Sequence, residues 1–400
     1  MTYPLALFFA AQACLTLALS MLSVAVGWHL YERTGDPFDL ALVGLMQILP
    51  IASLFIVSGW VVDNVQRKHV LIVCAVLQAG VFLGLLTAIE TDTFSRLGVF
   101  GLLLVMGIAR AFYSPAGQAY LPGLVTDEKL SSAVALSHTI RTAGEAFGPF
   151  VAGLLIAWLD VGIYRVLGIM ALVSATMYAL LPSLPVHRLT GRALSQLLDG
   201  VRFIIKNPLV LPAISLDLFI VLFGSVMVLL PVYAVDILNV GPEALGLMRA
   251  MPAVGAVGAG VLLARYSNLR NVGRLLFVAL ALFAISILVF AISSNIVLSL
   301  VALFAYGATD MVSVNVRMTT VQLSTPDSLR GRVNSVNYFF IATSNDLGDF
   351  RAGSIAALFG PVGAAVAGGV MSLLIAVGGY FAFPTLRRLD RLTDAKQGRN

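Results

Sequence analysis

The amino-acid sequence predicts an all-α membrane protein in which twelve transmembrane helices form two six-helix bundles. The first reason is composition, because 59% of the 400 residues are hydrophobic and only 11% are charged, whereas soluble domains carry about 25% charged residues. The second reason is a series of twelve apolar stretches, each about 20 residues long, which is the length that crosses the hydrocarbon core of a bilayer. The third is an internal repeat that divides these stretches six and six.

The predicted spans follow one another through the whole chain. They cover residues 5–31, 40–62, 70–89, 97–122, 131–158, 162–181, 208–235, 244–264, 273–292, 297–322, 333–358 and 362–383. No basic region precedes the first span and no small-residue cleavage site follows it. We therefore expect this stretch to remain in the protein rather than act as a signal peptide.

Lys and Arg are divided unequally between the two alternating sets of loops. If both termini are cytoplasmic, 17 of these residues lie on the inner side and four on the outer side, where eight acidic residues also lie. Because cytoplasmic loops carry the excess of Lys and Arg, the sequence predicts that both termini are cytoplasmic. The net charge of +5 is thus explained by the excess of Lys and Arg in the predicted cytoplasmic loops. No aromatic-interleaved basic patch indicates a nucleic-acid partner.

One long polar connection, residues 182–207, lies in the middle of the chain. Its apolar residues recur at helical spacing, at Leu194, Leu197, Leu198, Val201 and Ile205. This pattern predicts an amphipathic helix at the cytoplasmic interface. We therefore expect an N-terminal bundle over 1–181, a cytoplasmic linker over 182–207, and a C-terminal bundle with a short cytoplasmic tail over 208–400.

The two predicted bundles are related in sequence. Residues 121–135 align without gaps on 321–335, so that Asp127 corresponds to Asp327, and farther along Gly148 corresponds to Gly348. A duplicated six-span unit is typical of secondary transporters, whose substrate site lies near the middle of the membrane between the repeats.

The loop after the second span carries a recognisable motif. The segment from Gly59 to Lys68, with Asp63 and Arg67 inside it, resembles the G-x-x-x-D-[RK]-x-G-[RK]-[RK] signature of the major facilitator superfamily, although Asn64 and Gln66 depart from that pattern. The resemblance implies a loop that latches the two halves in one state. The alternative is that Arg67 and Lys68 only set topology.

Two further motifs support this resemblance. Arg110, in the segment 107–110, matches the buried Arg of the family's fourth-span motif. The fifth-span segment with Gly144, Gly148, Pro149 and Gly153 resembles the pattern associated with antiporters. Helix packing alone would also explain these small residues and the proline.

A narrower likeness is to the enterobactin-exporter and macrolide-efflux branch of the superfamily. It is carried by segments 31–37, 110–116 and 329–334. This resemblance implies a monomeric transporter of the bacterial inner membrane that exports a siderophore or drug-like small molecule in exchange for protons. The substrate itself is not predicted by the resemblance.

Nine of the ionisable residues inside the predicted spans are candidate site residues: Arg110, Arg141, Glu145, Asp217, Asp310, Arg317, Asp346, Asp349 and Arg351. Each would cost about 2.5–3.5 kcal/mol at the centre of a bilayer if it faced lipid. We therefore expect them to face one another or water, and to line a pathway for substrate and protons.

Several roles remain open for these residues. Arg141 and Glu145 share a helix face at i, i+4, so Glu145 either exchanges protons beside Arg141 or Arg110, or forms a structural ion pair. Asp217 is an unaccompanied acid and predicts a proton or cation site, unless it pairs with an Arg elsewhere in the chain.

The eleventh span carries the densest group of polar residues, including Asn345, Asp346, Asp349 and Arg351. We expect this face to line the central cavity. The alternatives are packing of this face against the motif loop at the cytoplasmic end, or pairing of Asp349 with Arg351.

Other chemistries find no support in the sequence. The four His residues are scattered, no group has metal-ligand spacing, and neither a phosphate-binding loop nor a nucleophile elbow is present. We expect neither an enzyme nor a bound metal or cofactor. Two alternatives to a proton-coupled exporter remain: a metal or metal-chelate carrier resembling ferroportin-type members, and a membrane receptor or scaffold that transports nothing.

Overall fold

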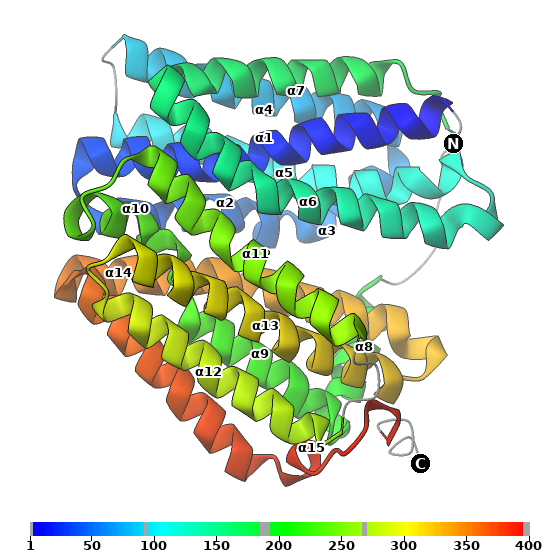
Figure 1. Ribbon diagram of the computed structural model, residues 1–400. Coiled ribbons are helices and arrows are strands. Elements are labelled where there is room, and N and C mark those ends of the chain that lie inside the picture. The colour runs from blue at the N-terminus through cyan, green and yellow to red at the C-terminus, as the bar shows by residue number, and fades with distance from the viewer. Residues whose placement is uncertain (1–2, 92–94, 185–192, 266–269, 395–400) are drawn as a thin grey trace. The chain divides into compact units, whose positions relative to one another are not determined.

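The computed structural model describes residues 3–91, 95–184, 193–265 and 270–394, and all regular structure in these ranges is helical (Figure 1). The helices preceding the central linker are α1 (Tyr3–Thr34), α2 (Pro37–Ser53), α3 (Phe55–Asn64), α4 (Arg67–Glu90), α5 (Arg96–Tyr120), η1 (Leu121–Leu124), α6 (Asp127–Leu159), η2 (Asp160–Gly162) and α7 (Ile163–Ala179). Those following it are α8 (Ala193–Lys206), α9 (Val210–Gly224), η3 (Met227–Leu229), α10 (Leu230–Val232), η4 (Tyr233–Ile237), α11 (Pro242–Arg265), α12 (Val272–Ile292), α13 (Ile296–Ser324), α14 (Asp327–Ala382) and α15 (Pro384–Arg387).

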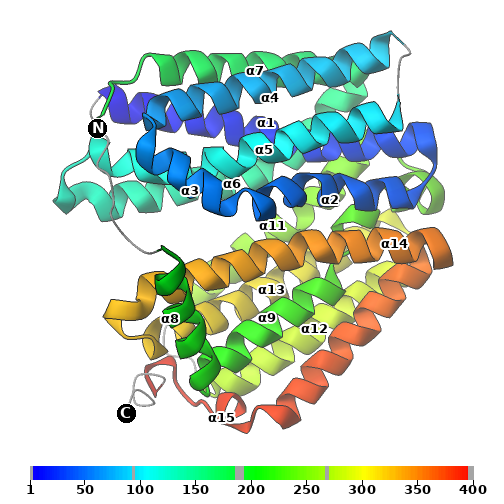
Figure 2. The same ribbon diagram turned by 180° about the vertical axis from the view of Figure 1, so that it is seen from behind.

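The chain divides into two compact units. Unit 1 comprises Met1–Gly35, Leu42–Thr190 and Val240–Leu247, and unit 2 comprises Asp36–Ala41, Gly191–Asn239 and Met248–Asn400. In unit 1, α1 packs against α6 and α7, while α4 packs against α5 and α7. In unit 2, α14 packs against α9 and α12, and α12 also packs against α13 (Figure 2). The predicted bundle boundaries at residues 181 and 208 stay a prediction.

Each of the twelve predicted spans falls on helices of the structure, but their number is not confirmed. Nine stretches of the described residues are long and apolar enough to cross a membrane, or ten if the bent pair α2 and α3 forms one span. One of the nine, Glu128–Ala179, contains α6, η2 and α7, and another, Thr343–Ala382, runs through a break in α14. The protein is thus a multi-pass membrane protein, and twelve crossings remain a prediction.

The break in α14 occurs at Gly360, where the predicted eleventh and twelfth spans meet. Its φ of 78° and ψ of 162° are not helical, and glycine adopts such a positive φ without the steric penalty that a Cβ imposes. Pro361 follows directly and lacks the backbone donor that a continuous helix would need. The chain therefore turns between two predicted spans without a polar loop.

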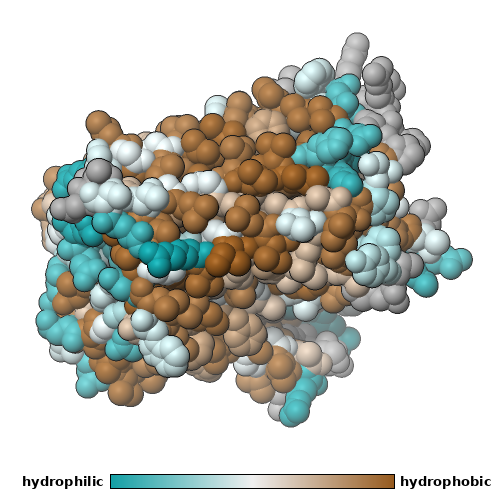
Figure 3. Space-filling view, turned by 90° about the horizontal axis from the view of Figure 1, so that it is seen from above, coloured by the Kyte–Doolittle hydropathy of each residue, from teal (hydrophilic) through white to brown (hydrophobic). Residues whose placement is uncertain are grey.

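Broad areas of apolar side chain lie on the outside of the molecule. Figure 3 shows one face on which hydrophobic residues predominate, with hydrophilic residues in separate patches. Trp158, Leu97 and Ile169 are among the large hydrophobic residues that are exposed. Exposed apolar surface of this extent requires an apolar solvent, which the hydrocarbon core of a bilayer supplies.

The predicted amphipathic helix of the linker is present as α8. Of its side chains, Ile204 is buried in a cluster with Val210, Val321 and Val333 of unit 2. The side chains of 193–199 and the segment 185–192 lie outside the described residues. The location of α8 at the cytoplasmic interface stays a prediction.

The internal repeat is visible in where helices begin and what they touch. Helix α6 starts at Asp127 and α14 starts at Asp327, the two positions that the sequence aligns. A Cβ on Gly148 of α6 would meet Ser20 of α1, and a Cβ on Gly348 of α14 would lie 3.1 Å from the side chain of Ser225, just after α9. The first and fifth predicted spans of each repeat therefore meet at an equivalent close approach.

Candidate functional site

A cluster of three charged side chains lies inside unit 2. Arg317 of α13 forms an ion pair with Asp217 of α9, and its Nη2 lies 3.9 Å from Oδ1 of Asp310, two turns earlier on α13. The Arg317 side chain is 4% exposed, that of Asp217 is 14% exposed and that of Asp310 is 40% exposed. The cluster thus holds two carboxylates and one guanidinium, with Asp310 as its most accessible member.

This geometry corrects the interpretation of Asp217 as an unaccompanied acid. Its partner, Arg317, lies 100 residues farther along the chain, and the spacing of residues in one sequence cannot reveal such a pair. The alternative that we kept open, pairing with an Arg, is the arrangement found. A role of Asp217 in proton or cation binding stays a prediction.

A second polar group surrounds the break that follows α9. After Gly224 the chain leaves helical geometry at Ser225, whose ψ is 125°, and continues through the short helices η3, α10 and η4. Arg351 of α14 donates from Nε to the carbonyl of Leu222 at 2.9 Å and from Nη2 to that of Phe223 at 2.6 Å. The hydroxyl of Ser225 donates to Asp349.

These contacts satisfy backbone groups that the break exposes. The final carbonyls of a helix have no intrahelical donor, and within a membrane each must find another one. A cationic side chain at a helix C-terminus is also favoured by the helix dipole. Arg351 therefore stabilises the end of α9, and it bonds to carbonyls of α9 rather than forming the ion pair with Asp349 that we considered.

The remaining predicted residues of the eleventh span lie on α14 near this group. Asn345 is exposed, and its amide donates to the carbonyl of Ile341 one turn earlier at 2.9 Å. Asp346 is partly exposed and has an interaction partner. Whether this face lines a pathway stays a prediction.

In unit 1, the mid-span arginine has a neutral partner. Nη1 of Arg110 on α5 donates to Oε1 of Gln47 on α2 at 2.8 Å. The two helices approach closely because Gly107, one turn before Arg110, lies against Gln47 and Pro50: a Cβ there would be 3.0 Å from Cα of Gln47. Arg110 is exposed, so its charge stays accessible while Gln47 orients it.

Glu145 and Arg141 lie one turn apart on α6, as predicted. Nε of Arg141 is 3.9 Å from Oε1 of Glu145, and the Glu145 side chain is 55% exposed. His138 lies on the same face, 3.5 Å from Nη2 of Arg141 and 3.3 Å from the hydroxyl of Thr142. The hydrogen bond of Arg110 goes to Gln47, so Arg141 is the cation beside Glu145.

Arg67, a basic residue of the motif loop, reaches the end of α5. Nη1 of Arg67 donates to the carbonyl of Ala119 at 3.0 Å, near the C-terminus of α5. Asp63, near the end of α3, makes no hydrogen bond or ion pair with any residue that the structure describes. Gly59 has open space where a Cβ would stand. A latch made by Asp63 and a role for Lys68 stay predictions.

The small residues of the fifth-span motif make close contacts within unit 1. A Cβ on Gly144 would meet Thr16 of α1 at 2.9 Å, and one on Gly153 would meet the Pro242 carbonyl at 2.6 Å. Pro149 lies inside α6, which continues through it. These contacts support the packing interpretation, and a role specific to antiport stays a prediction.

The membership of the chain in a family follows from a match along almost its whole length. A family model of the major facilitator superfamily, described as transmembrane secretion effector, matches residues 5–397. The chain belongs to this family. The resemblance that the motifs indicated is thereby confirmed, and the family points to a transporter rather than an enzyme.

Curated relatives of this major facilitator protein include enterobactin exporters. EntS of Shigella boydii serotype 18 is 27% identical over 95% of this chain and 92% of its own length. EntS of Escherichia coli O1:K1 is 26% identical over the same shares of the two chains. The similarity thus extends across both repeats.

Solved structures of transporters share the fold. A bacterial homologue of the human lysosomal transporter Spinster, in an inward-facing and occupied conformation, superposes with a TM-score of 0.76 at 12% identity and covers 96% of each chain. A bacterial homologue of the iron transporter ferroportin, in an inward-facing state, gives 0.71 at 17% identity and covers 95% of this chain and 99% of its own. At these identities the likeness shows the fold alone.

In this major facilitator protein, two polar residues were not identified from the sequence, one beside Arg110 and one beside the break that follows α9. Gln47 accepts a hydrogen bond from Arg110. Arg249 of α11 donates from Nη2 to the carbonyl of Met227 at 3.4 Å. A second repeat could have revealed both, because residues 44–50, Gly-Leu-Met-Gln-Ile-Leu-Pro, match residues 246–252, Gly-Leu-Met-Arg-Ala-Met-Pro. Gln47 and Arg249 occupy the same position in this repeat.

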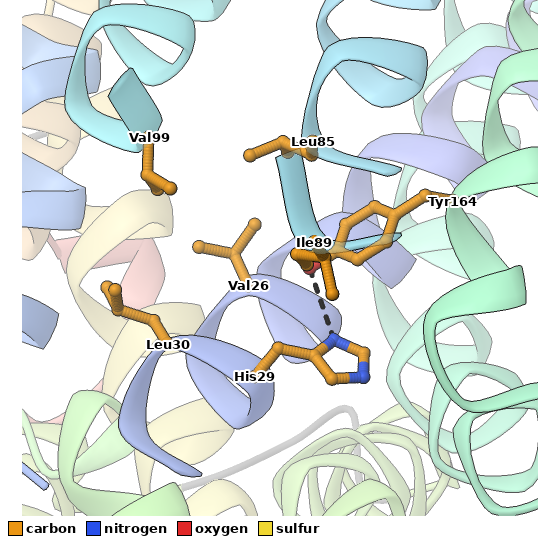
Figure 4. Close-up of a pocket in the computed structure, with 7 residues that line it drawn as sticks. All are labelled: Val26, His29, Leu30, Leu85, Ile89, Val99 and Tyr164. Carbon is orange, nitrogen blue, oxygen red and sulfur yellow. Dashed lines mark hydrogen bonds between the residues drawn. The ribbon is translucent and has the colours of Figure 1, made fainter. Parts of the chain in front are cut away.

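A further polar group in unit 1 was not predicted either. His29 of α1 is buried, and its Nε2 lies 3.1 Å from Oδ1 of Asp160, while its Nδ1 lies 3.2 Å from the hydroxyl of Tyr164. The ring borders a small cavity lined by Val26, His29, Leu30, Leu85, Ile89, Val99 and Tyr164 (Figure 4). Most of this lining is apolar, and His29 and Tyr164 supply its polar groups.

Among the residues that the structure describes, no three His, Cys, Asp or Glu side chains are placed to hold a metal ion. The charged clusters instead combine carboxylates with guanidinium groups. In general, a carboxylate can take up a proton and a guanidinium can bind an acidic group.

Proposed function

We propose that this protein is a proton-driven exporter that moves a siderophore or drug-like small molecule out of the bacterial cytoplasm by alternating access, as a monomer with twelve spans and both termini in the cytoplasm. The observation that carries the proposal is the cluster of Asp217, Arg317 and Asp310 in unit 2. Protons enter down their gradient, and the substrate leaves.

The cluster has an odd number of charges when both carboxylates are ionised. One positive and two negative groups leave a net charge of −1 among membrane helices, where an uncompensated charge is costly. Uptake of one proton makes the cluster neutral. Protonation of the cluster therefore lowers the free-energy cost of burying these three side chains among the helices of unit 2.

Asp310 is the member of the cluster that takes up the proton. Asp217 is in direct contact with Arg317 and is mostly buried, so its negative charge is compensated. Asp310 is farther from the guanidinium and more accessible. A carboxylate that is only partly compensated by a cation is the one that gains most from protonation.

Export of a siderophore is supported by the curated relatives, which are named enterobactin exporters. These relatives match the chain along 95% of its length, so both repeats of the transporter fold are shared. We extend that activity to this chain as a proposal, with drug-like molecules as the second substrate class.

The test is transport by the purified protein in lipid vesicles, with and without a pH gradient. We expect Asp310→Asn to reduce gradient-driven transport of enterobactin at least 100-fold while exchange of substrate without a gradient continues, because the neutral amide cannot carry a proton. Glu243→Gln, an exposed residue in the first turn of α11, is the matched control and should transport as the wild type does.

Three results would contradict the proposal. Full gradient-driven transport by Asp310→Asn would exclude this acid as the proton carrier. Uptake of free Fe²⁺ or Zn²⁺ in place of an organic molecule would favour a metal carrier. Binding without any transport in active vesicles would favour a receptor.

A further inference from the structure

The guanidinium of Arg110 is only partly used by the protein. Its Nη1 donates to Gln47, and its Nε and Nη2 have no acceptor among the residues that the structure describes. An arginine has five N–H donors, and the pair on the Nε and Nη2 edge is the pair that matches two oxygens of one acidic group. Gln47 thus fixes one side of the guanidinium and leaves this edge open.

The open edge lies deep in a span. Arg110 is in the middle part of α5, about 20 Å from its first residue at a rise of about 1.5 Å per residue. An exposed cation at that depth cannot face lipid without a large cost. It therefore faces a space that water or a ligand can enter.

Polar residues continue along the same face of α5. Ser114 and Gln118 follow Arg110 at i+4 and i+8, all three are exposed, and Gln118 donates to Ser114 at 3.3 Å. Side chains four residues apart lie on one face of a helix. These polar, exposed side chains form a stripe along one face of α5 that leads to Arg110.

The corresponding residue of the other repeat has the opposite charge. Arg110 and Asp310 are 200 residues apart, and each follows a glycine, Gly107 or Gly307, that packs against the helix carrying Gln47 or Arg249. In unit 2 the acid at this position has a cation nearby, Arg317. In unit 1 the described residues provide no carboxylate for Arg110.

We propose that Arg110, oriented by Gln47, binds an acidic group of the transported molecule, with two oxygens of a carboxylate or catecholate accepting from its Nε and Nη2 edge. The inference rests on the proposed transport function, which it deepens by naming the substrate class as acidic. The missing carboxylate partner is supplied by the substrate. Unit 1 thus recognises the anion, and unit 2 carries the proton.

The test is equilibrium binding to the purified full chain in detergent, which needs no gradient and is therefore independent of proton coupling. The probes are enterobactin as a catecholate, citrate as a carboxylate and ethidium as a cationic molecule without an acidic group. We expect wild-type protein to bind at least one acidic probe. Arg110→Gln should weaken that binding at least tenfold, whereas Arg110→Lys, which keeps the charge but loses the paired edge, should weaken it less.

Matched variants separate binding from folding. Arg96→Gln removes the same charge from the first residue of α5 and should bind as the wild type does. Gln47→Leu should weaken acidic binding severalfold, because it removes the group that orients Arg110. Thermal unfolding of each variant in the same detergent shows that it is folded.

Two results would overturn the inference. One is binding of both acidic probes by Arg110→Gln with wild-type affinity; the other is binding of ethidium alone by the wild type. Either result leaves the proposed proton-driven export untouched, because that function is tested by Asp310→Asn in vesicles. Loss of gradient-driven transport without loss of acidic binding in Asp310→Asn would show that the two functions are separate.

Discussion

The two repeats build the same helix contact and place opposite charges on it. In unit 1, Gly107 of α5 packs against Gln47 and Pro50 of α2, and Arg110 follows one turn later. In unit 2, Gly307 of α13 packs against Pro252, and Asp310 follows one turn later. A duplicated backbone frame can thus carry a cation in one half and an acid in the other, because packing depends on the glycine and the proline rather than on the charge.

The repeats also differ in the continuity of their first helices. Helix α1 is unbroken from Tyr3 to Thr34, whereas its counterpart α9 ends at Gly224, and three short helices follow. The position of Arg351, which bonds the freed carbonyls at the end of α9, is occupied in the first repeat by Val151. An unbroken helix needs no such donor, so the polar side chains of α14 compensate for a break that unit 1 does not have.

The largest difference in stability between the two units is expected when the arginine of each cluster, Arg317 or Arg110, is replaced. Arg317→Met leaves Asp217 and Asp310 without a cation, and breaking a buried ion pair by removing one partner costs about 3–5 kcal/mol. Arg110→Gln removes an exposed cation whose partner is neutral, and we expect it to change stability by less than about 1 kcal/mol. Thermal unfolding in detergent compares the two, and equal shifts would contradict the difference between the clusters.

A second, smaller effect is expected at the shared glycines. A Cβ on Gly307 would overlap the backbone carbonyl of Pro252, whereas on Gly107 it would meet the Gln47 carbonyl at 2.5 Å. Overpacking of this kind costs about 1–3 kcal/mol. We expect Gly307→Ala to lower the unfolding temperature more than Gly107→Ala does, with Gly331→Ala, where a Cβ has open space, as the control. The reverse order would show that the two contacts are not equivalent.

Much of the fold could be predicted from the sequence because its signals are local. The apolar stretches, the linker helix and the starts at Asp127 and Asp327 depend on residues close together in the chain, and the structure has helices at all of them. The pairing of Asp217 with Arg317 depends on how helices pack. A single sequence contains no local signal for that.

The breaks within spans could not be predicted from the sequence either. The seventh predicted span, 208–235, is apolar except for Ser215, Asp217 and Ser225, and nothing in its periodicity distinguishes α9 from the π-helical turn at Tyr233–Ile237. Only the side chains packed against it, such as Arg351 and Asp349, compensate for its break. The sequence identified Arg351 and Asp349 as charged residues inside a predicted span. The structure shows that they bond to groups at the break after α9.

A third prediction asks whether the proton is carried by one unit alone. Glu145 is exposed and lies 3.9 Å from Arg141, so its charge has solvent and a cation to compensate it. We expect Glu145→Gln to slow gradient-driven transport in vesicles less than about tenfold, a barrier change of under about 1.4 kcal/mol, and to leave substrate binding measurable. Complete loss of coupling in this variant would place the proton carrier in unit 1, as the alternative interpretation of Glu145 requires.

The smallest effect is expected at Asp63, because this residue has no hydrogen-bond or ion-pair partner among the described residues. In a latch, Asp63 would lie at the N-terminus of a neighbouring helix, where a carboxylate contributes about 0.3–1 kcal/mol. A contact that exists in only one state shifts the balance of states by no more than that free energy. We therefore expect Asp63→Asn to leave thermal stability in the present conformation unchanged and to slow turnover about two- to fivefold.

Paired spin labels across the cytoplasmic ends of the helices measure the same shift directly. If Asp63 belongs to a latch that forms in another state, its loss should raise the inward-open fraction of the distance distribution. Asn64→Ala, at the adjacent position whose amide donates to the carbonyl of Trp60 on the same helix at 2.8 Å, should leave the distribution as it is. An unchanged distribution in Asp63→Asn would mean that this acid serves topology or local folding, because a residue without contact in either state has no differential free energy with which to move the equilibrium.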